Sequence, residues 1–245
     1  MKIIISPAKK MNIEQDVSHK SLPVFLGNTQ EIKNTIQGLS YEALKDIWKC
    51  NDNLAKLNFD RFCNMDLERS LSPAIFSYEG LQYQYIGANV LDNNALEYIA
   101  DNLKIISGFY GVLRPFDGVT PYRLEMQAKI SIDNKKNLYD YWGDKLYKEI
   151  FKDNDMVLNL ASKEYSECIE RHLKSNDKFI TCLFYENVNG KFKQKATLAK
   201  MARGFMVRFL AENNIDNIND IKKFNDFGFS FNNDMSSEDK LVFVK

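Results

Sequence analysis

The residues of this chain most suited to chemistry are basic, and many of them fall in one acid-free segment. No Asp or Glu occurs between residues 187 and 211, although acidic residues make up 33 of the 245 positions. On a strand followed by a helix, these side chains are predicted to form two basic faces, one per element. They are Lys191, Lys193 and Lys195 on the strand, and Lys200, Arg203 and Arg208 on the helix. Two interpretations remain open, a solvated surface or a surface that contacts phosphate or nucleic acid.

A second candidate is the stretch "SGFYGVLRP" at residues 107–115. A helix predicted over 93–107 would end there, and Gly108 suits the position after a last helical turn. A glycine-containing hairpin with exposed backbone amides, followed by a basic residue, is typical of a helix-hairpin-helix element that holds a DNA backbone. The candidate DNA-contacting residues are Ser107, Gly108, Tyr110, Gly111 and Arg114. The alternative is a plain capped turn.

A third set of polar residues follows or begins predicted strands. Lys9 lies after the first strand, where ligands often bind in sheets flanked by helices, and Arg123 with Glu125 point the same way along a strand. An exposed lysine and a surface ion pair are the simpler interpretations. In the catalytic interpretation an aromatic ring stacks on a base while Glu125 or Asp144 activates water. The pocket would contain Ser6, Lys9, Tyr122, Arg123, Glu125, Trp142, Asp144, Asn159 and Ser162.

Several functional classes are disfavoured. The four cysteines have no zinc-site spacing, and the chain has two histidines, so we expect no metal and no cofactor. No GxxxxGK[ST] or GxGxxG loop occurs, and no Ser-His-Asp triad is indicated. The net charge is zero, so only a local basic face would bind nucleic acid. The absence of a signal peptide and of a long apolar run favours a cytoplasmic protein without a membrane span.

The elements that must position these residues alternate irregularly along the chain. Hydrophobic periodicity predicts strands at 2–6, 73–83, 122–132, 155–162, 179–187 and 191–198, with a closing hairpin at 227–245. Helices are predicted at 29–40 with Thr29 as N-cap, within 40–62, and at 93–107, 137–151 and 197–213, with a further helix after the N-cap Ser162. Residues 10–28 are expected to form a loop. Late antiparallel hairpins disfavour a doubly wound parallel sheet, so we expect a mixed α/β (α+β) fold in one domain, 1–245.

Five stretches together resemble, in order and spacing, the YaaA family of bacterial peroxide-stress proteins. They are "IISPAKKMN", "SGFYGVLRPFDGVTPYRLEM", "LYDYWGD", "NLASKEY" and "KMARG". The resemblance implies a cytoplasmic protein that limits peroxide damage to DNA and protein and is linked to lower free intracellular iron. It also implies a mixed α/β fold with a positively charged cleft, and double-stranded DNA binding through a helix-hairpin-helix element matched by "SGFYGVLRP". Lys10 stands where the family pattern suggests a small polar residue.

Two functions from different classes follow. In the first, duplex DNA is the partner and its backbone is held by Lys9, Arg114, Arg123, Lys200, Arg203 and Arg208. In the second, the chain is an enzyme acting on a nucleotide or a base. Direct iron sequestration is disfavoured because two histidines do not supply a typical iron ligand set. The oligomeric state is left open, with a monomer favoured.

Overall fold

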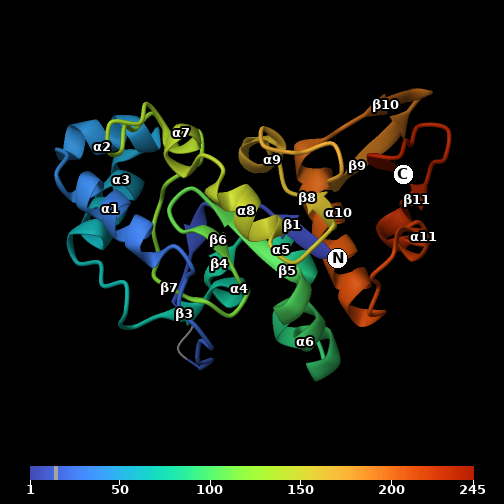
Figure 1. The fold of residues 1–245 in the computed structure, drawn as a ribbon, viewed down its shortest axis with the longest axis horizontal. Helices are drawn as coiled ribbons and strands as arrows, with labels where there is room; N and C mark the ends of the chain where they lie inside the picture. Colours follow the sequence, from blue (N-terminus) through green and yellow to red (C-terminus); the bar gives the residue numbers. More distant parts are fainter. Residues whose placement is uncertain (14–15) are drawn as a thin grey trace.

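A mixed β-sheet runs through the centre of the molecule (Figure 1). The computed structural model describes residues 1–13 and 16–245. Within them, eight strands form this sheet in the order β11-β12-β9-β8-β1-β5-β6, with β10 paired to β9. Their bounds are β1 Lys2–Ile5, β5 Leu103–Ser107, β6 Gly111–Leu113, β8 Met156–Leu160, β9 Lys178–Val188, β10 Lys191–Lys193, β11 Ser230–Phe231 and β12 Lys240–Val244. The chain is therefore one α/β domain with a mixed sheet, as the sequence predicts.

The five inner strands are parallel, and this fixes where candidate residues gather. β12, β9, β8, β1 and β5 pair in parallel, whereas β6, β10 and β11 pair antiparallel to their neighbours. Because parallel strands end at one edge, residues following β1, β5, β8 and β9 meet at the carboxyl edge of the sheet. This edge receives Ser6 to Lys10, the turn after Ser107, Ser162, and the segment leading into α10.

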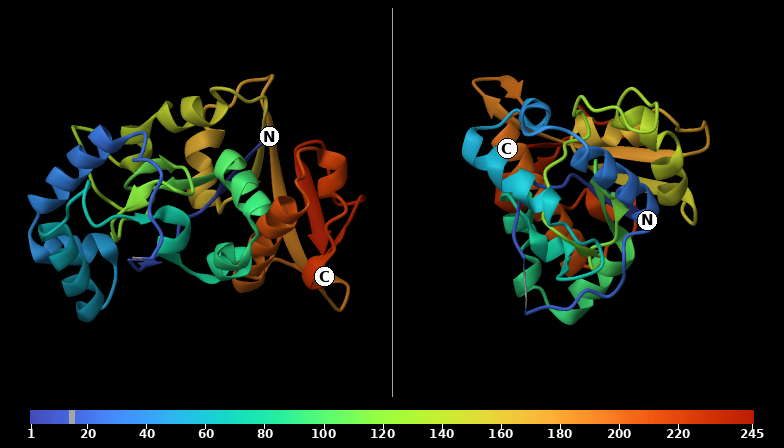
Figure 2. Two further views of the ribbon diagram at one scale, coloured as in Figure 1. Left: turned by 90° about the horizontal axis from the view of Figure 1, so that it is seen from below. Right: turned by 90° about the vertical axis from the view of Figure 1, so that its left-hand side faces the viewer.

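Helices cover both faces of the sheet, and β1 shows the consequence. Ile3, Ile4 and Ile5 are all fully buried, as expected for a parallel strand enclosed on both sides. α5 (Leu81–Ile86), α6 (Asn93–Asn102) and α10 (Ala196–Glu212) pack together, and α8 (Lys145–Phe151) packs with α9 (Lys163–Glu170). Figure 2 shows these two groups on different sides of the sheet.

The remaining elements are mostly short. α1 (Leu26–Gln37), α2 (Tyr41–Trp48) and α3 (Asp52–Cys63) form one end of the molecule, drawn in blue in Figure 1. Two small ladders pair β2 (Lys10–Met11) with β4 (Tyr78–Glu79), and β3 (Ser72–Pro73) with β7 (Gly118–Val119). The others are α4 (Ala74–Ser77), α7 (Leu138–Trp142), α11 (Ile218–Ile221), η1 (Ala88–Val90) and η2 (Asp226–Gly228).

Many predicted elements are confirmed. They are the first strand, the 40–62 helices with Ser40 capping α2, the strand at 155–162, the helix after Ser162, the strand at 179–187, the helix at 197–213 and the closing hairpin. The predicted loop at 10–28 contains the short strand β2 and the start of α1, and its residues 14 and 15 lie outside the described residues. Thr29 is not an N-cap. It lies buried inside α1, where its hydroxyl donates to the carbonyl of Phe25.

Two predicted strands are wrong, and one predicted helix is too long. The strand at 73–83 is instead α4, β4 and α5. The helix at 93–107 stops at Asn102, and Leu103–Ser107 is β5, because the buried Ile105 and Ile106 pair in the sheet. The segment 122–132 alternates buried and more exposed residues as predicted, yet it forms no extended strand in the described structure. The predicted alternation of buried and exposed residues is correct, but the segment does not form a ladder of hydrogen bonds with a neighbouring strand in the described structure.

Two further elements are shorter than predicted. The helix at 137–151 is divided into α7 and α8 at Gly143, whose positive φ of 49° ends α7. The second strand of the 179–198 hairpin ends at Lys193, and α10 begins at Ala196.

Candidate functional site at the carboxyl edge of the sheet

The "SGFYGVLRP" segment is a buried β-hairpin and not part of a helix-hairpin-helix element. β5 and β6 pair antiparallel, with Ser107 opposite Gly111. Residues 107–113 are all buried. The amides of Phe109 and Tyr110 donate to Ser107 Oγ, at 3.1 and 2.9 Å. These amides are satisfied inside the protein, so the expected phosphate contacts of Ser107, Gly108, Tyr110 and Gly111 have no surface in this structure.

Packing explains both glycines of this hairpin. A Cβ on Gly108 would lie 2.9 Å from the carbonyl oxygen of Leu124, so the 122–126 segment approaches the hairpin backbone closely. Gly111 has a φ of 74°, and a side chain there would press on Leu146, Phe25 and Trp142. Gly108 therefore joins the hairpin to the segment that carries Arg123 and Glu125, whereas Gly111 lets the hairpin pack on Trp142 and its neighbours.

Arg114 stabilises the same turn internally. Its guanidinium bonds the fully buried Asp117, with Nη2 at 2.9 Å from Oδ1, and also donates to the carbonyl of Leu22. Because a buried carboxylate needs a paired charge, Arg114 has a structural role that explains its position without DNA.

A compact polar cluster does form where β1 and β8 end. Ser6 Oγ accepts the amide of Ser162 at 2.8 Å and lies 3.2 Å from Ser162 Oγ. Nearby, Glu125 bridges two cations, with Oε2 at 2.8 Å from Lys9 Nζ and Oε1 at 3.3 Å from Arg123 Nη2. Lys9, Arg123, Glu125 and Tyr122 line one small hollow together with Tyr165. Four residues of the predicted pocket, Lys9, Tyr122, Arg123 and Glu125, therefore line this hollow, whereas Ser6 and Ser162 bond each other and are not in its lining.

Arg123 is the least satisfied member of this cluster. Its side chain is 11% exposed, and its buried Nε has no hydrogen-bond partner among the described residues. A guanidinium has donors in a fixed fork suited to planar anions, and an unused buried donor is costly. Arg123 therefore has a donor, Nε, available to bind an anionic or carbonyl group.

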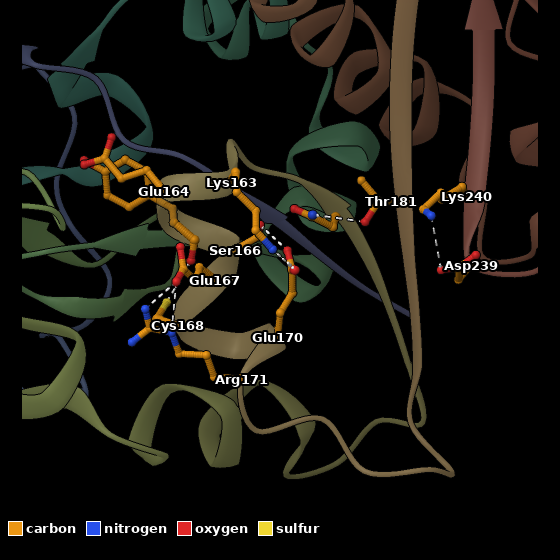
Figure 3. A network of polar contacts seen from close by, with 12 residues as sticks. Lys163, Glu164, Ser166, Glu167, Cys168, Glu170, Arg171, Thr181, Asp239 and Lys240 are labelled. Carbon is orange, nitrogen blue, oxygen red and sulfur yellow. Dashed lines mark hydrogen bonds and ion pairs between the residues drawn. The ribbon is translucent and has the colours of Figure 1, made fainter.

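Glu164 is a neighbour that the sequence analysis missed. Burial raises its pKa, and the nearby Glu125 carboxylate raises it further. The amide of Gln127 donates to Glu164 Oε1 at 3.3 Å, and Tyr139 donates to its backbone carbonyl. Figure 3 shows Glu164 on the opposite side of α9 from the ion pair of Lys163 and Glu170. The available sequence signal was its place in "NLASKEY", two residues after Ser162 and in the first turn of α9.

Tyr122 belongs to a buried hydroxyl chain. Its hydroxyl lies 2.6 Å from Ser107 Oγ and 2.8 Å from the hydroxyl of Tyr78. Burial raises the pKa of Tyr122 to about 12, so this phenol stays protonated near neutral pH. Tyr122 therefore connects the hairpin to the hollow and does not act as a base.

Besides Ser6 and Ser162, three residues of the predicted pocket do not line the hollow. Trp142 is fully buried behind the hairpin, where its indole donates to the carbonyl of Gly108. Asn159 lies within the sheet and bonds Thr181 and the amide of Ala161. Asp144 is exposed and paired with Lys148 at 2.7 Å. None of the three contributes to the hollow's lining.

The basic segment after β9 is only partly free. Lys191, Lys193 and Lys200 are exposed and make no ion pair with a described residue, whereas Lys195 lies 2.5 Å from Glu186. Arg208 pairs with Glu212 at 2.8 Å. Arg203 is half-buried, its Nε has no partner within the described structure, and burial lowers its pKa. Of the six residues of the two predicted basic faces, three lysines are therefore exposed and without an ion pair to a described residue.

A larger recess lies elsewhere and is not strongly basic. A cavity of about 1260 Å³ lies by the amino ends of β8, β9 and β12, where Met156, Lys178 and Lys240 begin these strands. Five carboxylates and four lysines line it, and none of the predicted site residues does. This cavity does not match the expected positively charged cleft.

Metal and membrane features are not evident in the described part of the chain. No group of three or more His, Cys, Asp or Glu side chains within it is arranged to hold a metal ion. None of its helices combines the length and apolarity needed to cross a bilayer.

Comparison with known proteins decides the family. A family model described as "Peroxide stress protein YaaA" matches residues 1–235. The chain belongs to the YaaA family. It is similar to proteins named "UPF0246 protein" from Agathobacter rectalis, 53% identical over all of this chain and 99% of the relative, and from Pediococcus pentosaceus, 50% identical over 100% and 98%. A relative of the same name from Limosilactobacillus reuteri is 51% identical over 99% and 98%.

Membership in the YaaA family supports a role in peroxide stress. The stretches that resemble the family also contact one another in the structure. "SGFYGVLRP" and "PYRLEM" are packed against each other through Gly108, and "SPAKK" and "NLASKEY" are joined through Ser6 and Ser162. Four separated stretches thus build one end of the sheet.

Proposed function

We propose that this YaaA-family protein serves in the peroxide response by binding double-stranded DNA in the cytoplasm as a monomer. The observation that carries the proposal is the set of free, exposed lysines at the carboxyl edge of the sheet, Lys191, Lys193 and Lys200. Lysines without internal partners gain more from a phosphate than lysines already held by carboxylates. Lys9 lies on the same edge and is 63% exposed. It would add a further phosphate contact where its ion pair with Glu125 breaks.

The DNA would contact the surface around β10 and the start of α10, and not the buried hairpin at residues 107–115. Arg114, Arg123 and Arg208 are excluded from the primary contacts because each is held by an acidic side chain. Bound DNA would be shielded from oxidants by occupancy, and this accounts for protection without a chemical reaction. The link to lower free iron is proposed as a cellular consequence, and no iron ligand is assigned.

The test is a titration of labelled duplex DNA between about 50 and 200 mM salt, over which phosphate-dominated binding falls by orders of magnitude. We expect a log–log slope of about −0.9 for each phosphate neutralised. Absence of binding at the lowest salt, or an affinity that ignores salt, would contradict the proposal.

A second candidate function is favoured by two neighbouring carboxyl groups, Glu125 in the lining of the hollow and Glu164 beside it. Burial raises the pKa of Glu164, whereas Glu125 pairs with both Lys9 and Arg123. Carboxyl groups in unlike environments are a common acid and base pair. We propose as the alternative an enzyme acting on a nucleotide or base held at this hollow by Arg123.

Glu125→Gln separates the two functions. In the enzyme, this variant fails to restore peroxide survival to cells lacking the protein, although the purified protein still binds duplex DNA. If Glu125→Gln cells survive peroxide like wild type, the catalytic alternative is rejected.

A further inference from the structure

The end of the β9–β10 hairpin, which we call the wing (residues 186–193), projects beyond the body of the sheet. β9 pairs with β8 only as far as Thr181, and its last residues pair with β12 and β10 instead. Figures 1 and 2 show the tip of the wing standing clear of the helices in every view. A surface that projects in this way is accessible to a large partner.

The tip of the wing is rigid despite its exposure. Its two-residue turn is Asn189-Gly190, with φ values of 53° and 80°, the combination that type I′ hairpin turns require. The amide of Gly190 also donates to Oδ1 of Asn187 at 2.9 Å. A rigid hairpin loses little conformational entropy on binding, so it is suited to presenting side chains to a partner.

The wing carries an exposed aromatic ring between free cations. Phe192 is 43% exposed and lies between Lys191 and Lys193. No ring contact joins it to another described aromatic residue, so its exposed part is available to a flat ligand such as a base.

The ring and the lysines point to opposite faces of the wing. Phe192 pairs with Asn187, whereas Lys191 and Lys193 pair with Val188 and Glu186, and directly opposed residues share a face. Tyr185, half-buried on β9, shares the face of Phe192 because it is two residues from Asn187. The wing therefore has one aromatic face and one basic face.

This combination matches the requirements of DNA with an unstacked base. Aromatic side chains on exposed strands stack on bases without reading sequence, and lysines nearby neutralise the backbone. A protein partner would be favoured by a wide apolar patch, but Phe192 is the one large exposed hydrophobic residue on the wing. The neighbouring charge, with Lys191 and Lys193 free, favours a polyanion.

We propose that the wing is a DNA-binding element in which Phe192, on one face, stacks on a base that is unpaired or unstacked, while Lys191 and Lys193, on the other face, contact phosphates of the same DNA. The inference rests on the proposed DNA-binding function and adds a preference for DNA whose stacking is interrupted. Tyr185 extends the platform toward the sheet. The hollow at Glu125 is not required.

The experiment compares two labelled DNA probes, a perfect duplex and the same duplex with one unpaired 2-aminopurine. Wild type is expected to bind the second probe more tightly and to quench its 2-aminopurine fluorescence. Phe192→Ala is expected to lose roughly 5- to 150-fold in affinity for that probe, the range of one stacked base, with an unchanged salt slope. Phe192→Trp is expected to retain binding and quenching.

Two matched variants separate this inference from the proposed function. Lys193→Ala should lower the salt slope by about one on both probes. Val90→Ala removes a 68% exposed aliphatic side chain from η1, outside the wing, and should change neither probe. Thermal unfolding of each variant checks that the fold persists.

The outcomes are distinct. If Phe192→Ala binds both probes like wild type while Lys193→Ala weakens binding, the stacking role is wrong and DNA binding stands. If Phe192→Trp does not restore quenching, or Val90→Ala loses as much affinity as Phe192→Ala, stacking is equally contradicted. If wild type binds neither probe at low salt, the proposed function and this inference fall together.

Discussion

At the scale of single residues, most of the predicted cations are already used inside the protein. Glu125 accepts both Lys9 and Arg123, and Asp117 accepts Arg114. The sequence predicts the Arg123–Glu125 pair because the two lie two residues apart. It does not predict Asp117 as the partner of Arg114, since the i,i+3 pair depends on a tight turn whose geometry the sequence leaves open. The lysines that make no ion pair are therefore better candidates for phosphate contact than the arginines, which are held by acidic side chains.

The hydroxyl chain through Tyr122 predicts a stability effect. Tyr122→Phe leaves the buried hydroxyl of Tyr78 without this partner, so the free energy of unfolding should fall by about 1–3 kcal/mol. Tyr41→Phe is the control, because its exposed hydroxyl makes one long bond of 3.3 Å to Asp52, and it should change stability by less than about 0.5 kcal/mol. Denaturant unfolding measures both. Equal losses would contradict a buried network at Tyr122.

Glu164 predicts a pH dependence. Its pKa is raised above the ordinary 4.5 by burial, so the folded state binds its proton more tightly than the unfolded state does. Ionisation of Glu164 therefore lowers stability as pH rises from about 4.5 through the raised folded pKa, and the penalty is absent at lower pH. Glu164→Gln should be more stable than wild type at pH 7, with the difference vanishing near pH 4.

Urea unfolding of Glu164→Gln and wild type at both pH values measures this effect. Glu68→Gln is a suitable control because Glu68 is exposed and outside the hollow. A constant difference between wild type and Glu164→Gln across this range would show that burial does not perturb the Glu164 carboxyl.

At the scale of elements, the hydrophobic period predicts burial better than it predicts hydrogen bonding. Residues 122–130 alternate in burial as a strand would, but the chain there packs on Gly108 and forms no extended ladder. Leu103 and Ile106 continue the apparent helical spacing of Leu96 and Ile99, yet pairing with β1 and β6 makes them part of a strand. In both places a long-range partner decides the structure, and the local sequence does not identify that partner.

The close crossing of α5 and α10 at Gly204 was not predicted from the sequence. A Cβ on Gly204 would lie 2.4 Å from the carbonyl oxygen of Gln82, so a glycine is needed for the two helices to touch. Gly204→Ala should destabilise the protein by at least about 1–3 kcal/mol through overpacking.

Gly27→Ala is the matched control for Gly204→Ala. Gly27 lies in α1 with nothing within 4 Å of its virtual Cβ, so alanine should be neutral or stabilising by up to about 1 kcal/mol. Thermal or denaturant unfolding gives both values. Opposite signs for the two substitutions are expected, and similar effects would contradict a close helix crossing.

At the scale of the whole molecule, five parallel strands bring distant motifs to one edge. The sequence predicts a mixed α/β domain, and the stretches shared with the YaaA family predict the membership that the family model confirms. The strand order is not contained in local patterns, so the meeting of Ser6 with Ser162 and of Lys9 with Glu125 needed the structure. The same edge bears the wing, remote from α1–α3 (Figure 1).

The central claim is that duplex DNA binds through the free lysines at this edge. The most direct measurement is the salt dependence of duplex binding for wild type, Lys200→Ala and Lys56→Ala. Lys56 is another exposed lysine, on α3 at the other end of the molecule (Figure 1). The account predicts that Lys200→Ala lowers the log–log slope by about one and weakens binding, while Lys56→Ala matches wild type. Equal slopes for all three proteins, or no binding at low salt, would contradict it.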